Sequence, residues 1–253
     1  MPLPCRAILI YPVLALVLAL TPSLAAADTE SGTYHYDARM AFLNAGALAL
    51  ELHRFGNEYE VSGEFQTSRT MSSYYTWNGI FAATGRWEGH GPVTTAYMSR
   101  TVSKDDDLKI VLTYDDSAHV LDGPDNDFEV IKKPGGIDLI SALFFSPSCY
   151  KGGLVHDGED TYQLNLRSEK QKVLKSGSNY YSGEVVNCDY SVVDHKQRKR
   201  RIVVSLAEIA GSTVAVQVRA KIPIFPDAYF RLRLPFETHT NLRTAQVAAS
   251  PAL

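Results

Sequence analysis

The fold class is decided by the stretch Val214-Ala-Val-Gln-Val-Arg-Ala-Lys-Ile222 near the end of the chain. Every second residue from Val214 to Ile222 is apolar, and polar residues at Gln217, Arg219 and Lys221 lie between them. Successive side chains of a β-strand point to opposite faces, so this pattern predicts a strand with one buried face and one face in water. Such strands are typical of antiparallel sheets.

The same alternation recurs over residues 34–40, 48–53, 58–66, 108–114 and 230–236. Short polar turns separate these segments, as is usual in chains of β-hairpins. We therefore expect a mainly β, antiparallel domain of about ten to twelve strands.

One segment departs from the period of two. Residues 137–145 are mostly apolar without alternation and lie between Pro134-Gly-Gly136 and Ser146-Pro147. Asp138 is placed to cap a short helix, because its side chain can accept hydrogen bonds from the free amides of the first turn. A lone apolar helix in a β protein is expected to plug or cover one side of the sheet.

The first 27 residues resemble a secretory signal peptide. Arg6 supplies a positive charge, residues 7–20 are apolar, and Ala25-Ala26-Ala27 offers small residues at a cleavage site. We expect cleavage after Ala27, with Ala26 as an alternative position. A membrane anchor is the competing interpretation, but the apolar run is shorter than the roughly 20 residues that span a bilayer. The prediction is export to the periplasm.

The remaining chain is predicted to be one domain over residues 28–237 and a disordered tail over residues 238–253. The formal charge is −3 for the full chain, and removing Arg6 makes it −4. This charge gives no reason to expect a nucleic-acid partner.

Two cysteines, Cys149 and Cys188, remain after cleavage. An even number of cysteines in an exported protein favours a disulfide. A catalytic thiol would need an adjacent base or a Cys-x-x-Cys pair, and the sequence has neither near these positions. We therefore predict a structural bridge between them.

No motif for catalysis, metal binding or nucleotide binding stands out, so no catalytic residue, metal ligand or cofactor is predicted. The acidic clusters at residues 105–107 and 122–127 lack the spacing of an EF-hand and fit tight turns instead. A hydrolase with residues brought together from distant positions stays open as an alternative. A strongly shifted pKa near His90, His119 or His156 would favour it.

A run of cations occupies residues 196–201. The simplest interpretation is a solvated hairpin loop that leads into a strand. The functional alternative is contact with the anionic headgroups of lipid or lipopolysaccharide. The residues predicted for this contact are Arg198, Lys199, Arg200 and Arg201. Four further cations would extend the patch if their strands are neighbours: Arg219, Lys221, Arg231 and Arg233.

Three short motifs resemble a periplasmic family catalogued as domain of unknown function 3108. They are Tyr-His-Tyr with Ala-Gly-Ala at residues 34–36 and 45–47, Asp-Leu-Ile-Ser-Ala-Leu at 138–143, and Tyr-Ser-Gly-Glu-Val-Val-Asn-Cys at 181–188. The resemblance implies a strongly curved antiparallel sheet, a half-barrel or open barrel similar to the LolA/LolB lipoprotein carriers, with a short helix packed on or inside it. It implies no catalytic residues.

A curved sheet with one apolar face must be filled by a helix, a ligand or a partner. We therefore expect a non-enzymatic periplasmic protein that supports the cell envelope by binding a lipid-like ligand or an envelope protein. The alternative is a scaffold with a fully plugged apolar face that recruits partners by strand addition. The residues expected to line the apolar face, as core or as ligand contacts, are Tyr36, Leu50, Phe65, Trp77 and Leu143.

Overall fold

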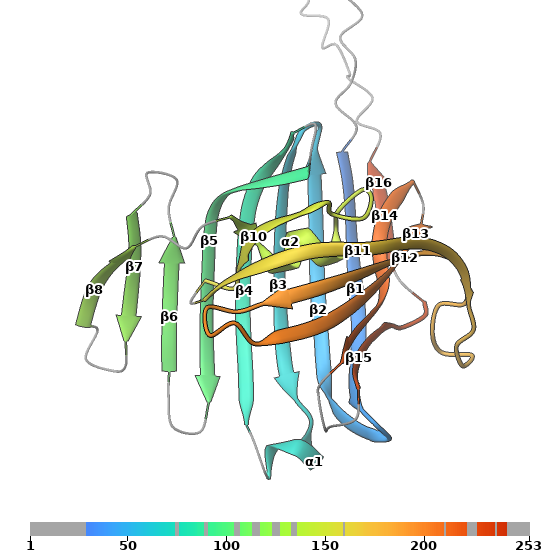
Figure 1. The fold of residues 1–253 in the computed structure, drawn as a ribbon, viewed down its shortest axis with the longest axis horizontal. Coiled ribbons are helices and arrows are strands. Elements are labelled where there is room, and N and C mark those ends of the chain that lie inside the picture. The colour runs from blue at the N-terminus through green and yellow to red at the C-terminus, as the bar shows by residue number, and fades with distance from the viewer. Residues whose placement is uncertain are drawn as a thin grey trace, which may run out of the picture.

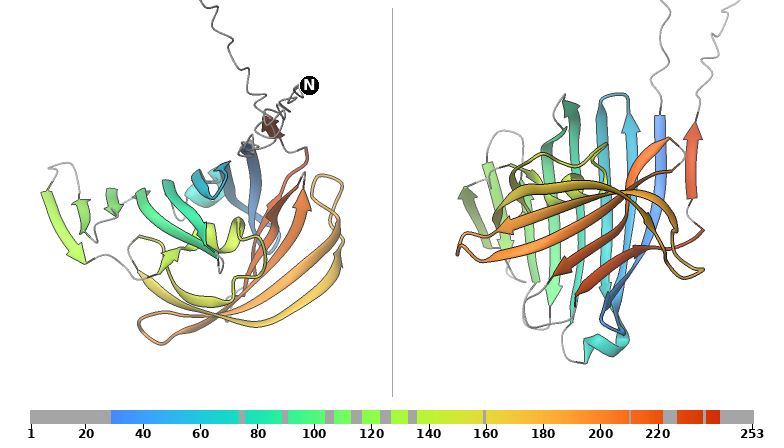
Figure 2. Two further views of the ribbon diagram at one scale, coloured as in Figure 1. Left: turned by 90° about the horizontal axis from the view of Figure 1, so that it is seen from above. Right: turned by 45° about the vertical axis from the view of Figure 1, so that its right-hand side comes forward.

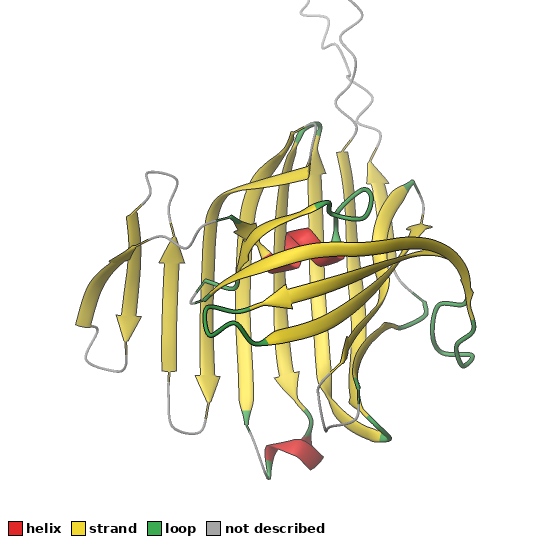
Figure 3. Cartoon of the chain, in the orientation of Figure 1, coloured by secondary structure: helices red, strands yellow, loops and turns green. Residues whose placement is uncertain are grey.

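A computed structural model describes residues 29–73, 76–88, 91–103, 107–112, 117–122, 127–132, 136–158, 160–209, 211–221, 227–235 and 237–241. The predicted signal peptide at residues 1–27 lies outside the described residues. So do His90 and parts of the two acidic clusters, at residues 105–106 and 123–126. The described part of the chain is mostly strand, with two short helices (Figure 3).

The first half of the chain forms long strands joined by tight turns. They are β1 (Thr29–Met40), β2 (Leu43–Phe55), β3 (Glu58–Thr67), β4 (Trp77–Glu88) and β5 (Gly91–Ser103), with the short helix α1 (Arg69–Ser72) between β3 and β4. Three shorter strands continue from β5: β6 (Asp107–Leu112), β7 (Ser117–Asp122) and β8 (Asp127–Lys132). Each strand in this half is antiparallel to the one before it.

The second half returns across the concave side of the first (Figure 1). It begins with β9 (Ile137–Asp138), helix α2 (Leu139–Phe144), β10 (Gly152–His156) and β11 (Thr161–Leu174). It ends with β12 (Gly183–Val193), β13 (Lys199–Ile209), β14 (Ser212–Lys221), β15 (Ala228–Leu232) and β16 (Glu237–Asn241). Short strands such as β9, with two residues, carry no visible alternation, so the expected strand number was too low.

The described strands make a single sheet in the order β8-β7-β6-β5-β4-β3-β2-β1-β15-β14-β13-β12-β11-β10-β9, and β16 pairs with β1 beside β15. The twelve strands from β5 to β9 in this order curl into a nearly closed barrel around α2 (Figure 2, left). Strands β6 to β8 continue the sheet away from the barrel. The predicted curved antiparallel sheet around a helix is confirmed.

The barrel is closed by side chains where its two ends meet. β5 and β9, the two ends of the twelve-strand barrel, are not paired by a backbone ladder in the described sheet, and β6 pairs only with residues 97–102 of β5. Instead, the Thr94 hydroxyl on β5 donates to the Asp138 carboxylate at 2.6 Å, and the Asp138 amide donates to the Thr94 hydroxyl at 2.9 Å. The Tyr97 hydroxyl adds a bond to the Asp157 carbonyl at 2.7 Å. We call this junction the seam.

Helix α2 begins where the sequence predicts. Asp138 is fully buried, and its side chain accepts from the Ser141 amide at 2.7 Å as the N-cap of the helix. One carboxylate therefore starts the helix and joins it to the seam.

The C-terminal boundary of the domain needs a correction. Residues 237–241 form β16, paired with residues 29–33 of β1, so the first residues of the predicted tail belong to the sheet. The sequence here is Glu-Thr-His-Thr-Asn, whose lack of apolar residues concealed a strand that is held by its backbone. Residues 242–253 lie outside the described chain.

Candidate functional site

A cavity of about 490 Å³ lies inside the barrel beside α2. Its lining is mostly apolar and comes from three directions. The wall of β2 to β5 contributes Leu48, Phe65, Gly79, Ile80, Phe81, Tyr97, Ser99 and Thr101. The opposite wall contributes Ile202, Val218, Ala220 and Phe230. Helix α2 contributes Leu139, Ile140, Leu143 and Phe144, and Asp157 follows β10. Among these lining residues, Ile80 is 46 % exposed.

Aromatic rings join the two walls to the helix. The Phe230 ring lies 6.2 Å from the Phe65 ring and 6.4 Å from the Phe144 ring, edge to face in both cases. The Tyr36 ring meets Phe144 from the other side at 5.3 Å. Edge-to-face pairs at these distances are favourable. They hold Phe144 and Phe230 in place around the cavity.

A glycine gives one ring room to enter the interior. A Cβ at Gly63 of β3 would lie 2.4 Å from the Phe81 ring and 2.6 Å from Leu50. These distances are shorter than real Cβ contacts, so only glycine leaves space for Phe81 to lie against the sheet. Phe81 is in turn part of the cavity lining.

The structure divides the five residues predicted for the apolar face. Phe65 and Leu143 line the cavity. Tyr36 and Leu50 face the interior but are fully buried core residues outside the lining. Trp77 is the first residue of β4, and its side chain is not among the described groups.

Tyr36 has a structural task of its own. Its hydroxyl donates to the Ala215 carbonyl at 2.9 Å, beside the register shift between β13 and β14. Burial raises the pKa of Tyr36 far above its ordinary value, as does the neighbouring Tyr34. The hydroxyl therefore stays protonated and remains a donor to a carbonyl that the irregular ladder leaves available.

The sequence did not predict which residues line the opposite wall. Val218, Ala220 and Phe230 alternate with cations in strands that the pattern identified correctly. The missing information was which strands face each other. β15 pairs with β1, and the curled sheet places Phe230 of β15 against Phe65 of β3 across the barrel.

Buried polar groups gather at the seam next to the cavity. His156 is 1 % exposed, and its ring meets the Tyr97 ring edge-on at 5.3 Å. Burial raises the pKa of Tyr97, and the carboxylates of Asp138 and Asp157 act in the same direction. Tyr97 is thus a lasting hydrogen-bond donor across the seam. His119 lies in β7, where side chains are not described.

Two other kinds of feature are absent from the described residues. No three side chains of His, Cys, Asp or Glu come close enough to hold a metal ion in that part of the chain. Neither helix there has the length and hydropathy needed to cross a bilayer.

The basic run forms the β12–β13 turn and the start of β13, as its hairpin interpretation predicts. Arg198 donates to Asp194 at 2.6 Å, and Arg201 forms a two-pronged ion pair with Asp189. Lys199 and Arg200 are exposed and have no ion-pair partner among the described residues. The four cations predicted to meet headgroups are therefore not equivalent, because two already hold carboxylates.

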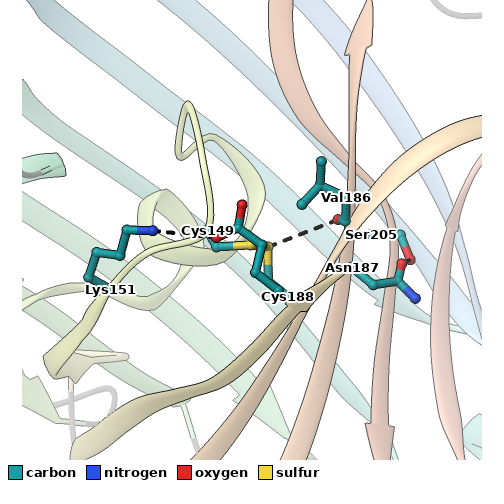
Figure 4. The surroundings of a disulfide bond; sticks show 7 residues. Cys149, Lys151, Val186, Asn187, Cys188 and Ser205 are labelled. Atoms are coloured by element: carbon teal, nitrogen blue, oxygen red, sulfur yellow. Dashed lines mark hydrogen bonds and ion pairs between the residues drawn. A yellow bond between two sulfur atoms is a disulfide. The ribbon is translucent and has the colours of Figure 1, made fainter. Parts of the chain in front are cut away.

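The predicted disulfide is confirmed. Cys149 and Cys188 are bonded, with their Cα atoms 5.4 Å apart, and both residues are buried. The bridge ties the loop after α2 to the inner face of β12 (Figure 4). It fixes the position of the helix relative to the wall that it packs against.

A family model described as a protein of unknown function, DUF3108, matches residues 35–232. No curated protein matches the chain. A β-barrel-like protein of domain of unknown function DUF1849 from Brucella abortus is similar at 11 % identity and a TM-score of 0.48, over 85 % of this chain and 99 % of that one.

A DUF1329 family protein from Desulfovibrio piger is 10 % identical with a TM-score of 0.28, over 87 % of this chain and 88 % of that one. The family match, in contrast, runs from within β1 to the end of β15 and includes the three motifs that resemble the family except for Tyr34. The chain belongs to the family of proteins of unknown function DUF3108.

Proposed function

We propose that this protein is a non-enzymatic binding protein of the cell envelope that holds a lipid-like ligand in its barrel. The observation that carries the proposal is the apolar cavity between α2 and the two walls. Its volume of about 490 Å³ lies within the roughly 300–1,000 Å³ of pockets that bind small molecules. Its few polar groups, among them Ser99, Thr101 and Asp157, suit a ligand that is apolar over most of its length.

The cavity also argues against the alternative of a scaffold whose apolar face is fully plugged. Helix α2 has six residues and fills only part of the interior. A scaffold would gain stability from a full core, since each empty methyl-sized space lowers stability. A binding protein retains this space, and the ligand supplies the missing contacts.

The setting that we propose is the periplasm. The predicted signal peptide motivates it, and the disulfide supports it, because such bonds persist in oxidising compartments. In this setting, a barrel that shields an acyl chain from water would support the envelope by carrying or sensing a lipid component.

The first test is native mass spectrometry of the mature protein from the envelope fraction of its own cells, followed by organic extraction. A stoichiometric adduct of lipid size is expected. A bare protein mass, with no change after adding lipid extract, would contradict the proposal. It would favour a protein partner instead, recruited to β8, which ends the described strand order with pairing on one side only.

A matched pair of variants connects the ligand to the cavity. Ala220→Leu adds three carbon atoms to the lining, whereas Ala47→Leu adds the same atoms to an exposed position on β2. The inner variant should lower the affinity for the apolar fluorescent probe N-phenylnaphthylamine about tenfold, as expected when a pocket loses volume. The outer variant should bind as the wild type does. Equal affinities for the two variants would place the ligand elsewhere.

A further inference from the structure

The outer face of β13, β14, β15 and β1 carries a continuous group of cations. Cross-strand partners in a sheet have side chains on the same face. The register pairs Arg201 with Lys221, Arg231 with Gln217, and Arg231 with Asp37. Arg219 and Arg39 are both partners of Tyr229. The neighbouring strands that a basic patch requires are therefore present.

Two tyrosines fix the guanidinium groups on this face. Arg231 lies over the Tyr229 ring at 4.9 Å and over the Tyr180 ring at 5.9 Å. Arg219 lies over Tyr229 at 5.4 Å, and Arg39 over Tyr180 at 5.9 Å. Such stacking is attractive and removes rotamer freedom before any partner binds. The cations are thus held as a preorganised array.

Positive charge exceeds negative charge in this array. Arg201 pairs with Asp189, Arg219 with Asp227, and Arg233 with Asp37. On the outer face of β13, β14, β15 and β1, the cations that have no ion-pair partner among the described residues are Arg39, Lys199, Lys221 and Arg231. This surplus is notable in a chain whose formal net charge is −3.

We propose that this array docks the protein on a bilayer that contains anionic phospholipid. The cations are spread over four adjacent strands, which at about 4.8 Å per strand is wider than a single phosphate. Several headgroups side by side match that spread. Tyrosine, with its apolar ring and polar tip, is suited to the headgroup region of a membrane. Leu234, which follows β15 directly after Arg233, is 40 % exposed and offers an apolar contact for the membrane.

The basic array is separate from the cavity. It lies on the outer side of β14 and β15, whose inner side lines the cavity, and each side is tested separately. Near an anionic surface each cation contributes roughly a fivefold change in affinity, and salt screens the effect.

The experiment is sedimentation of the mature protein with vesicles of phosphatidylcholine, with or without phosphatidylglycerol. Binding should require phosphatidylglycerol and should weaken as salt is added. The triple variant Arg39→Gln, Arg219→Gln and Arg231→Gln should bind roughly 100-fold more weakly. The matched control removes three cations from other surfaces: Arg69→Gln, Arg86→Gln and Lys151→Gln. It should retain most of the wild-type affinity.

One more variant separates the loss of charge from a loss of structure, because the triple variant also removes the ring stacks. Lys221→Glu changes only an unstacked cation and should weaken binding roughly 20-fold. Ala220→Leu, which alters the cavity, should leave vesicle binding unchanged. Binding to pure phosphatidylcholine, equal losses in the array and control triples, or unchanged binding of Lys221→Glu would each overturn the proposal. Binding to an acidic protein without binding to anionic vesicles would overturn it too.

Discussion

The two faces of β14 and β15 carry opposite chemistry on the same few residues. Inside the barrel, Val218, Ala220 and Phe230 border an apolar cavity. Outside it, Arg219 and Arg231 lie stacked on tyrosine rings in contact with water. Residues that are neighbours in the chain therefore belong to different surfaces.

The difference shows how one sheet can serve two binding tasks without an additional domain. The pleat separates the two faces completely, so a change on one side leaves the chemistry of the other intact. The two faces are also expected to contribute differently to the energetics of the protein. Inner residues contribute mainly to stability and cavity shape, whereas outer residues contribute mainly to charge.

The largest expected effect is on the inner side, at the disulfide. Replacing both Cys149 and Cys188 with alanine should lower the free energy of unfolding by about 4 kcal/mol, because the closed loop restricts the unfolded chain. Urea unfolding of the variant beside the wild type measures this. A loss below about 1 kcal/mol would mean that the bridge does not control the stability of the interior.

The next effect concerns the seam. Asp138→Ala removes the helix cap and the acceptor for Thr94, and should destabilise the protein by about 3 kcal/mol. Asp138→Asn keeps an acceptor for the Ser141 amide and should lose less than half as much. If the two variants unfold at the same urea concentration, capping is not what Asp138 contributes.

A third test uses adjacent residues on opposite faces. Phe230→Ala should cost about 2 kcal/mol, because it removes ring contacts with Phe65 and Phe144 from a half-buried position. Tyr229→Ala, one residue earlier, should cost less than about 1 kcal/mol. Thermal unfolding of both variants provides the comparison. The reverse order would show that the outer stacks, rather than the inner rings, hold β15.

The smallest effect is a pH dependence of the outer face. The hydrogen bond from Arg201 holds the pKa of Asp189 below its ordinary value. The pair therefore stabilises the folded state above about pH 4, where an unfolded aspartate is ionised, and loses this contribution as the pH falls further.

Arg201→Gln should remove this part of the pH dependence, and the change is small because the arginine is 41 % exposed and solvent screens the pair. Unfolding midpoints at pH 3 and pH 6 for variant and wild type measure it. An identical difference between the two midpoints in both proteins would exclude a role for the pair.

The sequence was sufficient for features encoded locally or by counting. Alternation located strands such as β14, Asp138 identified the start of α2, and the pair of cysteines identified the bridge. It was not sufficient for features that depend on pairing between distant strands. Phe65 and Phe230 meet because β1 lies between β2 and β15, which no local pattern encodes.

The same reason explains why the sequence could not separate core residues from cavity-lining residues. Tyr36 and Leu50 are on the predicted apolar face, but the depth of a residue in a barrel depends on what lies opposite it. In the sequence, the basic array appeared only as separate cations. Tyr180, which stacks on two of its arginines, lies in a loop 143 positions after Asp37, and its hydroxyl donates to that aspartate.

The pairing of β1 has a consequence for how the chain folds. Tyr36 is the partner of Leu232, 196 residues later, and β1 waits for β15 and β16 to complete its second edge. Contacts of such long sequence separation close large loops and make folding slow. Until the last strands arrive, β1 exposes an unpaired edge that is open to association with other chains. A polypeptide that ends before Ala228 would keep that edge permanently, so β15 and β16 protect the first strand from aggregation.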